Sequence, residues 1–343
     1  MPKNKEAAPD AAVKEPRNFY GGMLIMLAGP AFMACYFYGF QALLLLAVSV
    51  LSAVLSEAFC SLILRRKDSG LADLNAVFTG AVIALMLPAN APLFLAATGS
   101  IFAVLAAKLP FGGAKTAPFM PAAAGFAFLC VCWPGKVFHY PAVTAQFGAA
   151  APFAGESLAS LLHNGNSLSL NFINVFDILA GNVPGPMGAG CILVILASSC
   201  YLLFTRPKTL LAPLGYAAGC AVSALLFPRV STGHFSSMFL ELCSGTLVFT
   251  ALFLLPDPAV SPQGGNLRRT GYGVLSGVLC MVMRHFGAYE EGACFALLLS
   301  NAVWPFIENR LGGKRSAAGK KSVNNLFAGS APAVKNGGGA HGE

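Results

Sequence analysis

The sequence predicts an all-α polytopic membrane protein with about ten transmembrane helices, arranged as two five-helix inverted repeats. Composition is the first reason, because 56% of the 343 residues are hydrophobic and 10% are charged, which is far from the balance of a soluble domain. The second reason is a succession of apolar runs of about the length that crosses a bilayer. The third reason is a pattern that occurs twice in the chain, at Asp73–Pro121 and at Cys243–Glu308. Each copy has a polar patch, an apolar run that stops at proline, and a Phe-Gly loop that leads into another run.

Ten apolar runs follow one another along the chain, and each is near the length of helix needed to span the hydrocarbon. The third, fifth and ninth runs are short or contain Gly and Pro, which is typical of helices that break or stop within the membrane. The runs are 19–38, 40–64, 72–88, 92–109, 119–134, 187–205, 209–228, 239–256, 271–286 and 291–308.

The charge distribution predicts the orientation of these runs. With the N-terminus inside, all but Lys136, Arg229 and Arg284 of the 22 Lys and Arg residues fall on the cytoplasmic side. This pattern predicts a multi-pass protein of the cell membrane with both termini in the cytoplasm. The net charge of +8 is then explained by topology, and we expect the lipid bilayer rather than nucleic acid as the partner of these charges.

The domain organisation follows from the runs. Residues 1–18 are polar and carry no cleaved signal peptide, so they are expected to be a disordered cytoplasmic tail. Residues 19–310 form the membrane domain, with repeats at about 19–134 and 187–310 and an extracytoplasmic loop at 135–186 between them. Residues 311–343 are rich in Gly, Ala and basic residues and are expected to be a second disordered cytoplasmic tail.

No motif of known enzyme chemistry is present. The ten cysteines mostly lie within apolar runs and none forms a CxxC, so they are interpreted as small buried hydrophobic residues. The sequence has no Walker loop, Rossmann fingerprint, nucleophile elbow or zinc spacing. We therefore predict neither a catalytic residue nor a metal site.

Two acidic residues are candidates for ion handling. Glu57 lies inside the second run and must face a cavity or find a partner, although its carboxylate could also reach toward Arg65 or Arg66. Asp257 lies between two prolines where a run ends, and it could bind an ion or a partner. A carboxylate at a helix terminus near Arg268 and Arg269 is an equally simple interpretation of Asp257.

Several other polar or small residues have both a functional and a structural interpretation. Asn301 in the last run could bond to an opened backbone or simply join two helices. Gly185 and Gly188 permit a close approach by a flavin ring or by a packed helix. His285 could relay protons, but a single histidine at the interface is more often solvated.

Five segments together resemble a known family. Their most specific piece is the last, in which Phe286, Gly287, Glu291, Gly292 and Asn301 keep the order and spacing of that family. The chain is similar to the D-type membrane protein of the Rnf electron-transport complex (RnfD), a family related to the B subunit of the sodium-pumping NADH:quinone reductase. The segments are DLNAVFTGAVIALMLP (73–88), FGG with PF.PA (111–122), PGPMG (184–188), PDPAVSP (256–262) and RHFGAYEEGACFALLLSNAVWP (284–305).

The resemblance implies a ten-helix fold of two inverted repeats and work beside other Rnf-like subunits, of the C, G, A and E types. It also implies a flavin, FMN or riboflavin, that passes electrons across the membrane, with coupling to ion movement. The protein then supplies position and electrostatics while the cofactor does the redox chemistry. The chain is expected to be one component of an ion-translocating oxidoreductase complex rather than an enzyme alone.

Three positions depart from the family pattern. A threonine that carries FMN in the family is replaced here by Ala151, so covalent FMN is predicted to be absent. Two family asparagines before the fifth helix correspond to Ala117 and Met120, and a polar patch after PGxxG is the apolar stretch 188–191.

A flavin would then be non-covalent, with Gly185 and Gly188 as the candidate contacts. These losses motivate an alternative, a solute or flavin transporter built on the same scaffold, which the identity of neighbouring genes would distinguish.

Overall fold

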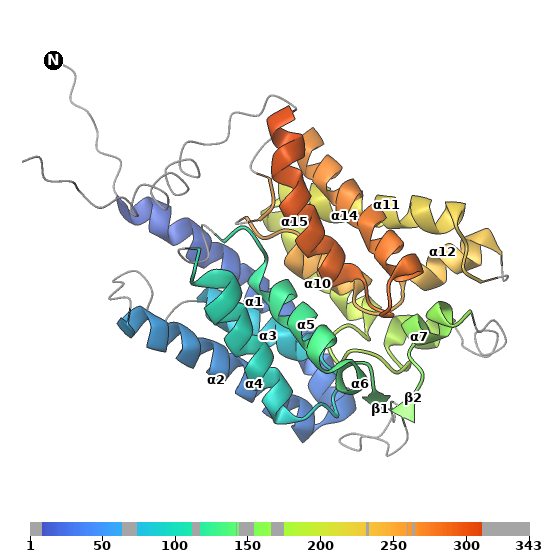
Figure 1. Cartoon of the computed structure of the whole chain (residues 1–343), viewed down its shortest axis with the longest axis horizontal. Helices are drawn as coiled ribbons and strands as arrows, with labels where there is room; N and C mark the ends of the chain where they lie inside the picture. The colour runs from blue at the N-terminus through green and yellow to red at the C-terminus, as the bar shows by residue number, and fades with distance from the viewer. Residues whose placement is uncertain are drawn as a thin grey trace, which may run out of the picture. The chain divides into compact units, whose positions relative to one another are not determined.

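The computed structural model describes residues 9–63, 74–111, 117–141, 143, 154–165, 175–230, 233–258, 260–262 and 265–310 (Figure 1), with side chains from residue 19. Residues 1–303 form one compact unit and 304–343 a second, of which 304–310 are described. The predicted C-terminal tail at 311–343 lies outside the described residues. At the other end α1 begins at Pro9, inside the segment predicted as a tail. Proline suits the first position of a helix, and alanines follow it, so local preference extends this helix beyond the apolar run.

The first half of the chain forms α1 (Pro9–Tyr38), α2 (Phe40–Ile63), α3 (Leu74–Met86), α4 (Leu93–Phe102) and α5 (Pro121–Cys132). Helix α4 continues as a π-helical segment, η1 (Ala103–Lys108). The connection to the second half contains α6 (Pro134–Val137), β1 (Tyr140–Pro141), β2 (Ala154–Gly155), α7 (Leu158–His163) and α9 (Val175–Ala180). Strands β1 and β2 pair antiparallel, with Tyr140 opposite Gly155.

The second half forms α10 (Ile192–Thr205), a 3₁₀ turn η2 (Pro207–Leu210), α11 (Leu211–Leu226), α12 (His234–Leu242) and α13 (Leu247–Phe249). A second π-helical segment, η3 (Thr250–Leu254), continues α13, and α14 (Asn266–Phe286) and α15 (Ala293–Arg310) complete the described chain. Every predicted apolar run therefore contains a helical segment.

Three described helices are long and apolar enough to cross a membrane, namely Phe19–Tyr38, Phe40–Ile63 and Pro207–Leu226. A fourth candidate is the pair His234–Leu242 and Leu247–Leu254, which is bent by 61°. Shorter apolar helices lie in five of the other runs, and the run 271–286 lies within α14, which has 21 residues. Helix α3 with its 13 residues is only about 20 Å long. The fold is thus a mostly helical one with apolar helices, as expected of an all-α membrane protein, while the count of ten spans and the inverted repeat stay predictions.

Helix α3 is buried among α1, α2 and α5, whereas α2 exposes an apolar face that includes Leu51, Leu55 and Phe59. A helix that is hydrophobic all round belongs in an interior, and an exposed apolar face in a membrane protein suits lipid. Gly80 lets α3 approach α2, because a Cβ there would lie 2.8 Å from the Ser49 carbonyl oxygen. The Ser49 hydroxyl donates a hydrogen bond of 2.6 Å to the Gly80 carbonyl, which links the two helices.

Helices α11 and α14 lie side by side with their backbones in contact (Figure 1). Four glycines, two from each helix at i and i+4, permit this approach. A Cβ would lie 2.5 Å from a carbonyl oxygen of the opposite helix at Gly215, 2.7 Å at Gly219, 2.1 Å at Gly273 and 2.3 Å at Gly277. This glycine seam follows the small-xxx-small rule by which membrane helices gain close packing.

Candidate functional site

The break between α12 and α13 is the structural origin of the candidate site. Helix α12 ends at Leu242 and α13 begins at Leu247, and Gly245 between them has a φ of +59°, which favours glycine. Breaking a helix leaves carbonyl groups at the end of one half and N–H groups at the start of the other without partners. Inside a membrane these groups must be satisfied by the protein itself.

Glu291, from the loop between α14 and α15, satisfies the start of the second half. Its two carboxylate oxygens accept hydrogen bonds from the Thr246 backbone N–H at 2.9 Å and from the Thr246 hydroxyl at 2.7 Å. A carboxylate is the charge that a helix N-terminus favours. The start of α13 is thereby tied to a residue far along the chain.

Arg284 of α14 satisfies the end of the first half. Its guanidinium donates to the Ser244 carbonyl oxygen at 3.0 Å and to the Ser244 hydroxyl at 2.5 Å. It also pairs with Glu241 at 3.0 Å and with Glu291 at 3.5 Å. Its side chain is 1% exposed, and both terminal nitrogens of the guanidinium fork donate to protein groups.

Arg229 completes a balanced set of charges, since its guanidinium lies 3.3 Å from Glu241. We call Arg229, Glu241, Arg284 and Glu291 the broken-helix cluster. It contains two cations and two carboxylates, and both carboxylates are buried. Charges at such depth are costly unless paired and hydrogen-bonded. Each charge of the cluster has an opposite partner within 3.5 Å, while Glu241 Oε1, Arg229 Nη2 and Arg284 Nε form no hydrogen bond among the described residues.

Glu290 is a third acid beside the broken-helix cluster. It lies in the loop between α14 and α15, and its carboxylate accepts a hydrogen bond of 2.9 Å from Ser157, which itself caps α7 by accepting from the Ser160 N–H. Burial, and next the nearby charge of Glu291, raise the pKa of Glu290 to about 7. The side chain is thus poised to gain or lose a proton near neutral pH.

We expect the stability of the protein to fall as pH rises from about 4.5 to about 7, in part because of Glu290. In this window the folded carboxyl holds a proton that the unfolded carboxyl has lost, and above pH 7 the full cost, up to roughly 3 kcal/mol, is present. Glu290→Gln should flatten this part of the pH dependence, measured as unfolding temperature in detergent at pH 5 and pH 8. Glu156→Gln, at an exposed neighbour of Ser157, is the control and should keep the wild-type dependence.

We expect Gly245→Ala to destabilise the protein by about 3 kcal/mol or more, because it combines backbone strain with a steric clash. A Cβ at Gly245 would lie 1.7 Å from a Glu291 carboxylate oxygen and 2.9 Å from the Arg284 guanidinium. Gly165 is a matched control, since its φ is +67° and no atom lies within 4 Å of the added Cβ. Gly165→Ala should therefore cost only the strain, about 1 kcal/mol, in the same denaturation measurement. Equal losses in the two variants would contradict the role of the cluster.

The structure gives Glu57 a buried partner on another helix. Its carboxylate lies 2.8 Å from the ammonium group of Lys108, and the two side chains are 3% and 1% exposed. Lys108 is the last residue of the π-helical segment η1, and such wide turns are frequent at functional sites. Arg65 and Arg66, the alternative partners, lie outside the described residues.

Asp257 and Asn301 are each engaged by a tyrosine from another helix. Both carboxylate oxygens of Asp257 accept hydrogen bonds of 3.1 Å from the Tyr20 hydroxyl. The Tyr272 hydroxyl donates to the Asn301 side-chain oxygen. Asn301 thus joins α15 to α14, which is the structural role considered for it above.

The segment Gly185–Gly188 is packed against the end of α3. The Gly188 N–H donates to the Leu85 carbonyl at 2.8 Å, and a Cβ at Gly188 would lie 2.4 Å from the Leu85 side chain. The cavity beside Gly185 has a volume of about 30 Å³. A flavin ring does not fit there in this conformation. Ala151, the position of the absent covalent link, lies outside the described residues.

Sequence reasoning missed the broken-helix cluster. Arg284 and Glu291 stand at the ends of apolar runs, where a charged side chain normally reaches water, and Glu241 lies just inside a run. The available signal was Gly245 with its polar neighbours inside an apolar run, which indicates a break that needs charged partners. His285, expected to be solvated, has its two ring nitrogens 2.9 Å from the carbonyl oxygens of Met281 and Phe227.

The described residues contain no group of three or more His, Cys, Asp and Glu side chains placed to hold a metal ion. The buried charges are instead organised in pairs and in one larger cluster at a broken helix. Buried charge in a membrane protein usually marks a path for ions or protons, and discontinuous helices are a common way to build one.

Comparison with known proteins places the chain in a family. The profile of the NQR2, RnfD, RnfE family matches residues 13–315. The chain is 32% identical over 289 residues to the D subunit of the Na(+)-translocating ferredoxin:NAD(+) oxidoreductase complex of Acetobacterium woodii, covering 83% of this chain and 86% of that protein. It is also 32% identical over 294 residues to the D subunit of the ion-translocating oxidoreductase complex of Pseudomonas paraeruginosa, covering 81% and 85%. The corresponding protein of Cronobacter sakazakii is 28% identical over 323 residues, covering 83% and 91%.

Proposed function

The chain belongs to the NQR2, RnfD, RnfE family, and on this basis we propose that it is the D-type membrane component of an Rnf-like ion-translocating oxidoreductase complex. The observation that carries the proposal is the family match over residues 13–315, which includes nearly all of the described chain. The relatives are named as subunits of complexes. The partners proposed here are Rnf-like subunits of the C, G, A and E types, as the resemblance of the sequence implies.

The proposed activity is electron relay across the membrane with coupling to ion movement. A flavin, FMN or riboflavin, bound without a covalent link, supplies the electron-carrying chemistry when present. Because the Gly185–Gly188 segment does not fit a flavin ring, no step is assigned to that place. The contribution of this chain is to hold charged groups at fixed positions inside the membrane.

The broken-helix cluster supports the ion-coupling part of the proposal. Arg284 and Glu291 hold the two halves of a bent helix pair together, and Glu290 beside them changes charge near neutral pH. An ion or proton that moves along this side of the protein therefore passes the carboxyl group of Glu290, whose charge depends on pH. Glu57 and Lys108 supply a second buried pair in the first half of the chain.

The proposal also includes the placement of the chain. It lies in the cell membrane with both termini in the cytoplasm and with residues 135–186 outside, as the distribution of Lys and Arg indicates. On this topology α3 and the α12–α13 pair belong to matching positions of an inverted repeat, with Pro88 and Pro256 at their breaks. Labelling of a cysteine introduced at Asn164 only from the cytoplasmic side would contradict this orientation.

The test of the function is deletion of the gene in its host. Inverted membrane vesicles that lack the chain are expected to lose two activities. One is electron transfer between ferredoxin or NADH and the acceptor, and the other is the ion uptake that is coupled to this transfer. The full-length chain, returned with an affinity tag, should restore both and should co-purify with the other subunits. Vesicles that keep full electron transfer and ion uptake without the chain would overturn the proposal, and a defect confined to uptake of a solute would favour a carrier.

We expect no covalent FMN on this chain, because Ala151 has no hydroxyl to form the phosphoester and residues 147–154 contain none. Attachment at Thr144 or Ser157 would move the anchor by roughly 20 Å along an extended loop. The measurement is flavin fluorescence of the chain in a denaturing gel, after expression with the flavin-transferring enzyme. Fluorescence in an Ala151→Thr variant with Ala149→Gly, and none in the wild type, is the expected result, whereas a fluorescent wild-type band would contradict it.

A further inference from the structure

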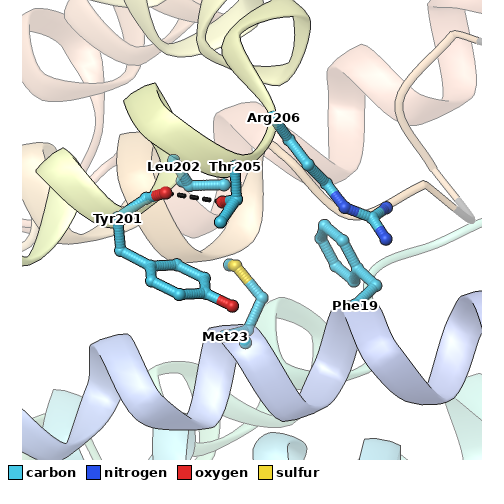
Figure 2. A pocket seen from close by; sticks show the side chains of 7 residues that line it. Phe19, Met23, Tyr201, Leu202, Thr205 and Arg206 are labelled. Atoms are coloured by element: carbon cyan, nitrogen blue, oxygen red, sulfur yellow. Dashed lines mark hydrogen bonds between the residues drawn. The ribbon is translucent and has the colours of Figure 1, made fainter.

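A cavity of about 220 Å³ lies between α1 and α10, away from the broken-helix cluster. Figure 2 shows its walls, which come from the start of the apolar part of α1 and from the last turn of α10. The space exists because Gly22 has no side chain, since a Cβ there would lie 2.8 Å from the Tyr201 hydroxyl. The other lining side chains are Phe19, Met23, Tyr201, Leu202, Thr205 and Arg206.

The walls of this cavity are apolar and its mouth is cationic. Phe19, Met23 and Leu202 are each less than 5% exposed, whereas Arg206 is exposed. The guanidinium carbon of Arg206 lies 5.4 Å from the centroid of the Phe19 ring. Figure 2 shows the two side chains next to each other. Such a contact holds the guanidinium in place while leaving its N–H groups available. Within the part of the chain that the structure describes, Arg206 forms no ion pair with a carboxylate.

The Phe19 ring that contacts Arg206 also packs against a neighbouring aromatic side chain. It packs edge-on against Tyr20 with centroids 5.4 Å apart, and the Tyr20 hydroxyl is bonded to Asp257. The cation at the mouth is therefore preorganised, which lowers the entropic cost of binding an anion.

More positive charge and an apolar surface adjoin the mouth. Lys208 is exposed on η2, and Arg269 of α14 donates a hydrogen bond of 3.2 Å to the Lys208 carbonyl oxygen. The outer face of α10 exposes Leu203 and Phe204, which are 54% and 85% exposed. Arg206 thus stands where an apolar helix surface ends and a basic turn begins, as at the boundary between hydrocarbon and headgroups.

We propose that this cavity binds one anionic phospholipid molecule, with its phosphate at Arg206 and the start of an acyl chain between Phe19, Met23 and Leu202. The match is one of charge and polarity together. A guanidinium fork binds phosphate oxygens, the basic turn adds attraction for a net negative headgroup, and the apolar walls receive methylene groups. A free phosphate ion uses only the first of these features.

The test is native mass spectrometry of the full chain, delipidated in detergent and titrated with phosphatidylglycerol or with phosphatidylcholine of the same acyl chains. The wild type is expected to retain phosphatidylglycerol about tenfold better. Arg206→Gln should remove most of that preference and leave phosphatidylcholine binding unchanged, whereas Arg206→Lys should keep part of it. Lys136→Gln is the control, since it removes one exposed cation from α6, which does not line the cavity, and it should change the preference less than about twofold.

A second variant tests the cavity rather than the charge. Thr205 is exposed at the mouth, so Thr205→Phe fills the opening without disturbing buried packing and should weaken both lipids. Inorganic phosphate at millimolar concentration should not displace the lipid, and displacement would mean that the site takes a free anion. Equal retention of both lipids by the wild type, or an unchanged preference in Arg206→Gln, would overturn the proposal. An affinity-purified complex in which another subunit protects this face from lipid would overturn it as well.

Discussion

Replacing Arg284 with methionine is expected to destabilise the protein by about 3–5 kcal/mol, because it leaves Glu241 and Glu291 buried without their shared cation. The change also removes the donors that satisfy the Ser244 carbonyl at the helix break. The measurement is the free energy of unfolding in a mixed-detergent titration, followed by the yield of folded protein. Methionine preserves most of the side-chain volume, so the loss reports charge and hydrogen bonding rather than a cavity.

Two further variants separate the parts of that effect. Arg284→Lys keeps the charge and loses the fork, so an intermediate loss is expected. Combining Arg284→Met with Glu291→Gln removes one orphaned carboxylate and should recover part of the stability. Lys136→Met removes an exposed cation and should cost less than about 1 kcal/mol. A loss below about 1 kcal/mol for Arg284→Met would mean that the broken helix does not depend on the cluster.

Replacing Lys108 with methionine is expected to cost about 3–5 kcal/mol for the same reason in the first half of the chain, since Glu57 would keep a buried charge. The reverse single change, Glu57→Leu, should cost a similar amount. The double variant should be much closer to the wild type than the sum of the single losses, because a well-packed apolar pair often replaces a buried ion pair at little cost. Unfolding of all four proteins under one condition gives the coupling energy.

This cycle also has a functional readout. If the pair only supports packing, the double variant should carry out ion-coupled electron transfer at the wild-type rate. If the pair takes part in ion movement, the double variant should fold normally and lose ion uptake while electron transfer persists. Strictly additive losses in the stability measurements would show that Glu57 and Lys108 do not interact.

The helices were predictable because segments that lie inside a membrane consist mostly of apolar residues. The run at 72–88 contains α3, and the prolines that end the runs at 88 and 256 stand where helical structure stops. The run at 239–256 was predicted as a single span, but the chain breaks it at residues 243–246. A run of apolar residues reports that a segment is buried, and it does not report how often its backbone turns.

The candidate site was predictable only in part, because sequence spacing encodes neighbours within one helix and not between helices. Glu57 was identified as a charge in need of a partner, yet nothing in the sequence singles out Lys108. Asp257 and Asn301 were identified as well, and the tyrosines that engage them come from α1 and α14. Arg284 was not predicted to belong to a buried site, because a cation at the end of an apolar run is usually solvated.

The glycine seam between α11 and α14 imposes an order on biosynthesis. Membrane helices insert one after another and associate afterwards, and α11 leaves the ribosome before the broken pair α12–α13, which in turn precedes α14. The seam can therefore close only when the broken pair is already in the bilayer, and Arg284 arrives with the helix that closes it. Until then the opened backbone at Ser244 and the carboxylate of Glu241 have no guanidinium from α14 to satisfy them. A chain that ends before α14 therefore lacks the donors that Arg284 supplies to Ser244 at the helix break.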